Sequence, residues 1–165
     1  MTSRGAEPLP RAVAWLGYGG LLPFVALAAA SVAAHLSGKY SAANPQQWNA
    51  ALLAYGAAIL SFVGALHWGF AMTLSGMNPA QRTASFVWSV VPALMASVAL
   101  LTPPMAATAL LVAGFCVHYW RDRRLASHAD LPGWYLPMRL RLTVVACLCL
   151  CVAALAPLLR TSPGT

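Results

Sequence analysis

Residues 50–74 read AALLAYGAAILSFVGALHWGFAMTL, an apolar stretch that contains no Asp, Glu, Lys or Arg. A helix needs about 20 predominantly apolar residues to cross the hydrocarbon core of a bilayer. Backbone groups in lipid must also find their hydrogen bonds within their own segment, which excludes an isolated strand. The stretch therefore predicts a membrane-spanning helix.

Four further apolar stretches flank this one, and the five expected helices cover residues 13–36, 50–74, 85–101, 105–120 and 142–159. Residues 121–141 are predicted to form a basic cytoplasmic loop. The composition agrees, since 60% of the residues are hydrophobic and 8% are charged, whereas soluble domains carry about 25% charged residues. The sequence thus predicts one all-α transmembrane domain over residues 1–165, a polytopic helix bundle.

The first apolar stretch has a second interpretation, as a secretory signal peptide. Arg4 and Arg11 would then form its positive region, and the Ala-rich residues 28–34 its cleavage site. Its apolar run is longer than the usual signal core of about 7–15 residues, which favours a retained helix. Cleavage would leave the rest of the topology unchanged.

Basic residues gather on one side of the predicted topology. With the N-terminus in the cytoplasm, the cytoplasmic segments hold all of them except Lys39 and Arg160. Short cytoplasmic loops are rich in Lys and Arg, and this bias sets the orientation. The predicted topology-setting residues are Arg82, Arg121, Arg123, Arg124, Arg139 and Arg141.

The net charge of +7 indicates contact with lipid headgroups and not with nucleic acid, because the arginines lie at the ends of apolar runs. We expect a multi-pass protein of the bacterial inner (cytoplasmic) membrane, with the mitochondrial inner membrane as the alternative. The four cysteines, Cys116, Cys147, Cys149 and Cys151, fall within apolar runs. There they are expected to pack as small hydrophobic side chains, and no metal site is predicted.

Small residues recur every four positions in the helix predicted over residues 50–74. Ala57, Ser61, Ala65 and Gly69 would share one side of that helix. Small side chains at this spacing let two membrane helices approach closely, and a serine hydroxyl can bond across the contact. We therefore predict a helix-packing stripe.

Two histidines are the candidate cofactor-binding residues. His67 and His118 both fall in the cytoplasmic halves of their predicted helices, and an ionisable group at membrane depth is a functional candidate. Paired imidazoles could bind haem, or a quinone headgroup beside Trp68 and Tyr119. The alternatives are structural: His67 bonds a backbone carbonyl, and His118 pairs with Asp122 one turn away.

Three stretches resemble the signature of a known family. They are Tyr55-Gly56 through His67-Trp68-Gly69, then Trp88 through Pro92, and then Asp122-Arg123-Arg124 followed by Leu131-Pro132, Trp134-Tyr135 and Arg139 through Thr143. The family consists of small bacterial inner-membrane proteins classed as a domain of unknown function, and it includes a mitochondrial transmembrane protein. The resemblance implies a five-helix membrane protein and supplies no catalytic residues.

No constellation of an enzyme active site is recognisable, and no catalytic residue is predicted. The leading hypothesis is a non-enzymatic accessory or assembly partner of a larger membrane complex. The alternatives are a redox-associated protein that binds haem or a quinone through His67 and His118, and a small-solute carrier.

Overall fold

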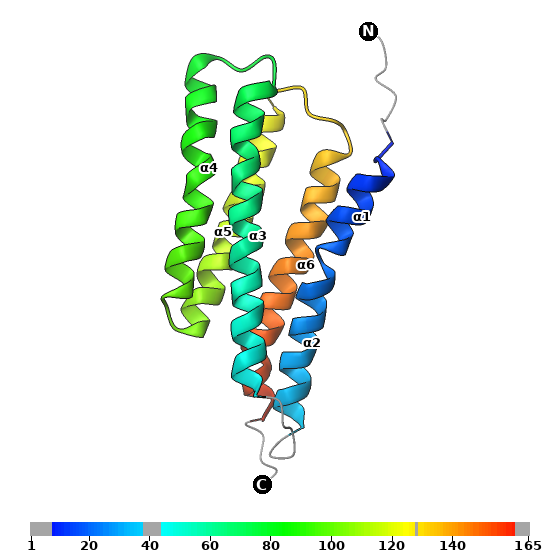
Figure 1. Ribbon diagram of the computed structural model, residues 1–165, viewed down its shortest axis with the longest axis vertical. Coiled ribbons are helices and arrows are strands. Elements are labelled where there is room, and N and C mark those ends of the chain that lie inside the picture. Colours follow the sequence, from blue (N-terminus) through cyan, green and yellow to red (C-terminus); the bar gives the residue numbers. More distant parts are fainter. Residues whose placement is uncertain (1–7, 38–43, 128, 161–165) are drawn as a thin grey trace.

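The regular structure of the chain is entirely helical within residues 8–37, 44–127 and 129–160, which are the residues that the computed structural model describes (Figure 1). The elements in chain order are α1 (Arg11–Gly19), α2 (Leu22–Leu36), α3 (Pro45–Thr73), α4 (Pro79–Leu100), α5 (Pro104–Ala126), α6 (Tyr135–Leu155) and the short 3-10 helix η2 (Ala156–Arg160).

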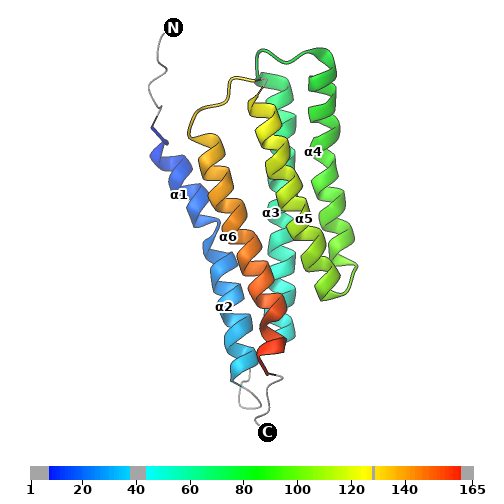
Figure 2. The ribbon, with the colours of Figure 1, turned by 180° about the vertical axis from the view of Figure 1, so that it is seen from behind.

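Helices α1 and α2 follow one another as a single bent rod, so the bundle has five long rods (Figure 2). The bend lies at Gly20-Leu21, two residues before Pro23, which has no backbone N–H to continue the hydrogen-bonding pattern. Four rods are long and apolar enough to cross a membrane: Arg11–Leu36, Pro45–Thr73, Pro79–Leu100 and Tyr135–Leu158. These findings confirm the predicted helical membrane bundle.

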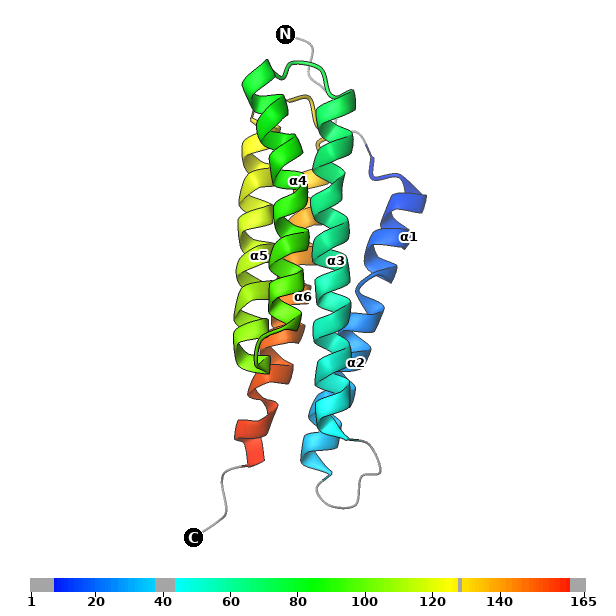
Figure 3. The same cartoon turned by 60° about the vertical axis from the view of Figure 1, so that its left-hand side comes forward.

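Consecutive rods run in opposite directions, so the start of α1 and the end of α6 lie at opposite ends of the bundle (Figures 1 and 3). Proline stands in the first turn of α3, α4 and α5, where its missing N–H costs nothing. Asn78 caps α4, because its side-chain oxygen accepts a hydrogen bond from the Gln81 backbone N–H at 2.9 Å. The Asn78 backbone N–H in turn donates to the Gln81 side-chain oxygen, also at 2.9 Å. Gly76 supplies a φ of 87° in the preceding turn, a value that glycine adopts without strain.

The helices extend further than their apolar stretches predicted. Helix α5 continues to Ala126 and α6 already begins at Tyr135, so most of the predicted loop over residues 121–141 is helical. The prediction ended the fourth helix at residue 120 because charged residues follow. In the structure, one of those residues, Asp122, faces the bundle interior and pairs with Arg139 of α6, which removes the reason for the helix to end there.

The core runs along the middle of the bundle, and its largest buried side chains include Phe24 of α2, Leu60 of α3, Leu111 of α5 and Leu150 of α6. Helix α3 touches most of its neighbours through small residues on its inner face. A Cβ at Gly64 would lie only 2.7 Å from the Pro92 ring of α4. The absence of a side chain at Gly64 therefore allows α3 and α4 to pack closely.

The predicted packing stripe lies only partly on this inner face. Ala57 is buried, and Ser61 is half-buried and donates its hydroxyl to the Ala57 carbonyl of its own helix at 2.8 Å. Ala65 and Gly69 are exposed, and among the described residues no atom lies within 4 Å of a Cβ built at Gly69. The stripe is therefore not an internal packing surface over its whole length.

Candidate functional site

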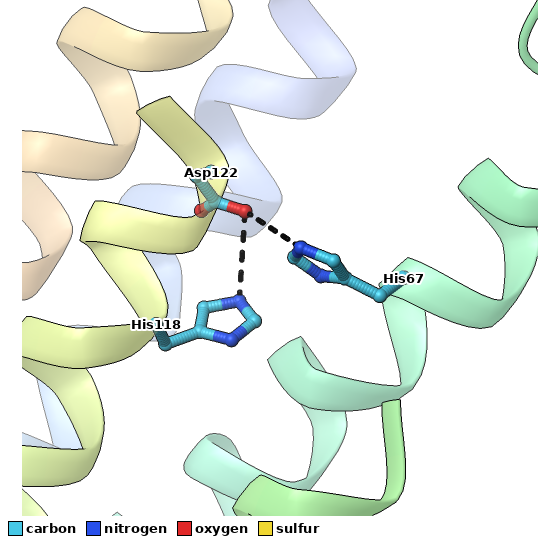
Figure 4. Close-up of side chains that lie close together, drawn as sticks. All are labelled: His67, His118 and Asp122. Atoms are coloured by element: carbon cyan, nitrogen blue, oxygen red, sulfur yellow. Dashed lines mark ion pairs between the residues drawn. The ribbon is translucent and has the colours of Figure 1, made fainter. Parts of the chain in front are cut away.

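A buried polar cluster joins three helices near the end of the bundle where α3 and α5 end and α6 begins. It consists of His67 on α3, His118 and Asp122 on α5, and Arg139 on α6, three of which Figure 4 shows side by side. His67 is 1% exposed, His118 and Asp122 are 0% exposed, and Arg139 is 8% exposed. We call these four residues the polar cluster.

Asp122 is the centre of the polar cluster. Arg139 Nε donates to its Oδ2 at 2.9 Å, so the carboxylate has a cationic partner. The Nε2 atoms of His67 and His118 both lie 3.7 Å from the other oxygen, Oδ1 (Figure 4). The two imidazole rings meet edge to face, with centroids 4.9 Å apart. The cluster thus crosses the bundle from α3 to α6.

Local sequence explains how these side chains meet. His118 and Asp122 are four residues apart on α5, so they share one face of that helix. His67 lies on the buried face of α3, in line with Leu60 and Gly64. Arg139 lies in the second turn of α6, on the face that packs toward α5.

A hydrogen bond from Trp88 fixes the tautomer of His118. The indole Nε1–H of Trp88, on α4, donates to His118 Nδ1 at 3.2 Å. A neutral imidazole that accepts at Nδ1 carries its own proton on Nε2. The Nε2–H of His118 therefore points toward Asp122 Oδ1, although the distance of 3.7 Å is too long for a hydrogen bond.

His67, His118 and Asp122 could also be considered as metal ligands, since one ligand atom from each lies within 4.8 Å of the other two. A metal would need a lone pair on His118 Nε2, but the bond from Trp88 places a proton there. Arg139 in addition already compensates the Asp122 charge. The donor set therefore fits a hydrogen-bonded cluster better than a metal site.

A cavity of about 230 Å³ lies over His67, between α3, α4 and α5. Its lining combines two arginines with polar and apolar side chains: His67, Met77, Gln81, Ala84, Ser85, Arg121, Arg124 and Leu125. Both ring nitrogens of His67 are buried and have no hydrogen-bond partner among the described residues. His67 is thus the member of the polar cluster that lines the cavity.

The other predicted site residues are placed differently. Trp68 is exposed and packs edge to face against Phe86 at 4.9 Å, and Tyr119 is half-buried; neither lines the cavity. The sequence predicts His67 and His118 as the candidates and gives Asp122 only as a helix neighbour of His118. It predicts Arg139 as a topology-setting residue, and Trp88 belongs only to a stretch that resembles the family signature.

The predicted topology-setting arginines lie where α3 and α5 end and where α4 and α6 begin, and we call this the basic end. Several bond to nearby groups as well. Arg82 donates to the Ala71 carbonyl at the end of α3, and Arg141 donates to the Tyr18 hydroxyl at 3.2 Å. Arg121 donates to the Ala84 carbonyl at 3.2 Å, while Arg123 is exposed.

Comparison with known proteins places the chain among membrane proteins. The family model described as "Protein of unknown function (DUF3429)" matches residues 9–155. Transmembrane protein 69 of Xenopus tropicalis is 35% identical over 152 residues, which cover 87% of this chain and 53% of that protein. The chain therefore spans about half the length of the curated relative it matches. No solved structure matches the chain. These matches confirm the resemblance that the three motif stretches indicated.

Proposed function

We propose that this chain, which belongs to the DUF3429 family, is a non-enzymatic accessory or assembly partner of a larger membrane complex. The chain is a multi-pass membrane protein by its helices and by its relative. The observation that carries the proposal is the exposed small-residue face of α3, formed by Ala65 and Gly69.

The small-residue face has the properties of a helix-docking surface. Phe62 and Met72, which flank it on the same side of α3, are each 64% exposed. The large side chains of Phe62 and Met72 flank the small residues Ala65 and Gly69, which leaves a shallow depression in the helix surface. The backbone of a second helix could approach closely at this depression. Membrane helices associate through close packing of small residues, because lipid itself gives no hydrophobic drive for association.

The polar cluster supports a structural and non-enzymatic role. Asp122 is bonded by Arg139, and His118 is bonded by Trp88. His118 is therefore not available as a general base without breaking an internal hydrogen bond, and the Asp122 charge is stabilised as an ion pair. These two hydrogen bonds instead connect α4, α5 and α6, which would keep the basic end rigid for a partner.

Co-purification from native membranes tests the accessory role. We expect wild-type chain to retain a stoichiometric membrane protein partner, and Ala65→Leu to reduce its recovery about tenfold, since overpacking a contact costs about 1–3 kcal/mol. Ala113→Leu is the matched control, because Ala113 is also exposed, on α5. A chain that purifies alone, or equal effects of the two variants, would contradict the proposal.

The bacterial inner membrane, with the basic end in the cytoplasm, is the proposed location; the mitochondrial inner membrane is the alternative. Labelling of single cysteines in a cysteine-free background tests the orientation. Ser75 lies in the α3–α4 connection at the basic end, and Thr102 in the α4–α5 turn at the opposite end. An impermeant maleimide added outside intact cells should label Thr102→Cys, and should label Ser75→Cys only after lysis. The reverse pattern would contradict the orientation, and labelling of both sites from outside would contradict the topology.

A redox role is a second candidate, favoured by the contact between His67 and His118. Their edge-to-face packing at 4.9 Å leaves no room for a planar macrocycle between the rings, so we do not propose haem. A quinone headgroup would instead occupy the cavity and bond to His67. Quinone in a lipid extract of the purified chain, and its loss in His67→Ala, would support this candidate; unchanged quinone in that variant would remove it.

A further inference from the structure

The cavity over His67 contains a polar side chain whose hydrogen-bonding capacity is unused. His67 is 1% exposed, and its Nδ1 and Nε2 atoms are buried without a hydrogen-bond partner among the described residues. Buried polar groups in native proteins are nearly always bonded, so an unbonded one calls for a specific explanation. A ligand in the cavity that His67 lines would supply the missing partner.

The charge around the cavity selects for an anion. Arg121 and Arg124 both line it, and none of the described lining residues is acidic. Asp122 lies behind His67, but Arg139 compensates its charge at 2.9 Å. The charged side chains that line the cavity are therefore both cationic.

The two arginines are positioned by aromatic rings. The guanidinium carbon of Arg121 lies 5.2 Å from the centroid of Trp88, and its NH2 group also donates to the Ala84 carbonyl. The guanidinium carbon of Arg124 lies 3.9 Å from the centroid of Trp120. Side chains held in this way lose less freedom on binding than free surface arginines do. Several donors of each guanidinium suit oxyanions, above all phosphate.

The position of the cavity also favours a phosphate group as its ligand. It lies at the basic end, where the arginines of the helix termini would meet the phosphate groups of a bilayer. Basic pockets between membrane helices on the cytoplasmic side are a recurrent kind of binding site for anionic lipid headgroups. A volume of about 230 Å³ is small, so it suits a single headgroup and not a whole cofactor.

We propose that the cavity over His67 binds the phosphate group of an anionic ligand, with Arg121 and Arg124 as its cationic partners and His67 as the donor at its base. Gln81 and Ser85 of α4 complete the polar lining. The phosphate belongs either to a phospholipid headgroup or to a soluble phosphate. This inference does not depend on the accessory role, because the small-residue face of α3 is a different surface.

Binding to purified full-length chain in a zwitterionic detergent tests the proposal with three probes: phosphatidylglycerol, phosphatidylcholine and inorganic phosphate. We expect saturable binding of phosphatidylglycerol over phosphatidylcholine if the ligand is a lipid, or of inorganic phosphate if it is soluble. Arg124→Gln and His67→Leu should each weaken binding about tenfold or more, since the first removes a charged donor and the second removes the imidazole donor to a charged group. Arg123→Gln is the matched control, because Arg123 is adjacent in sequence and does not line the cavity.

Several outcomes would overturn the proposal. Binding of none of the three probes would do so, as would equal weakening by Arg123→Gln and Arg124→Gln, which would indicate general surface charge. Equal affinity for phosphatidylglycerol and phosphatidylcholine, without binding of inorganic phosphate, would also contradict an anion site. A quinone recovered from the cavity in place of a phosphate would favour the redox candidate. His67→Leu has no donor and is of similar size, and an elution volume equal to that of the wild type checks that it folds.

Discussion

Replacing Arg139 by Met is expected to lower the free energy of unfolding by about 3–5 kcal/mol, because the substitution removes one partner of a buried ion pair. Asp122 is 0% exposed and Arg139 8% exposed, and their bond is 2.9 Å long. Without the guanidinium, the carboxylate would remain in the interior beside two neutral imidazoles, which cannot compensate a full charge. Unfolding in mixed micelles with increasing denaturing detergent, followed by circular dichroism, measures the loss.

A matched arginine and a double variant separate this effect from a general loss of charge. Arg141 is in the same helix, is exposed, and bonds to the Tyr18 hydroxyl at 3.2 Å, so Arg141→Met should cost less than about 1 kcal/mol. Combining Arg139→Met with Asp122→Leu removes both charges and should recover much of the stability. Equal costs for the Arg139 and Arg141 variants, or no recovery in the double variant, would show that the buried pair does not stabilise the fold.

The helices could be predicted from the sequence because their physical cause is local. Four of the five rods contain an apolar run long enough to span lipid, and proline or asparagine begins α3, α4 and α5. The ends of α5 and α6 could not be predicted in the same way. They depend on the contact between Asp122 and Arg139, which are 17 residues apart and meet only once the helices pack.

The candidate site was predicted in part. Topology placed His67 and His118 in the same half of the bundle, and the structure brings their rings together. The role of Trp88 depends on how α4 rotates about its own axis, and no residue pattern of a single helix determines that rotation. The three motif stretches that carried the family resemblance nevertheless converge here, since they contribute His67, Trp88, Asp122 and Arg139.

The face of α3 that packs internally was the least predictable feature. Small residues occur on two sides of this helix: Gly56 and Gly64 on one, and Ala65 and Gly69 on the other. Spacing alone identified the second set. The neighbouring helix determines which set packs inside the bundle. Here the rigid ring of Pro92 on α4 lies opposite Gly64.

Replacing Gly64 by Ala is therefore expected to destabilise the chain by up to about 3 kcal/mol, the usual range for overpacking a close contact. The added methyl group would lie 2.7 Å from both Cβ and Cγ of Pro92 and 3.2 Å from Cδ. These atoms belong to a buried ring that is closed onto the backbone, so the contact can be relieved only by moving α4 away from α3. Thermal unfolding in detergent measures the change.

Gly69→Ala is the matched control because it makes the same chemical change in the same helix. A Cβ at Gly69 meets no described atom within 4 Å, so this variant gains helix propensity without a clash. The difference between the two variants therefore isolates the contact with Pro92. Gly114→Ala should fall between them, because the new methyl group would lie 2.6 Å from a Leu60 methyl group at the end of a flexible side chain, which can rotate away. If Gly64→Ala is as stable as Gly69→Ala, the close approach of α3 and α4 is not what holds this part of the bundle together.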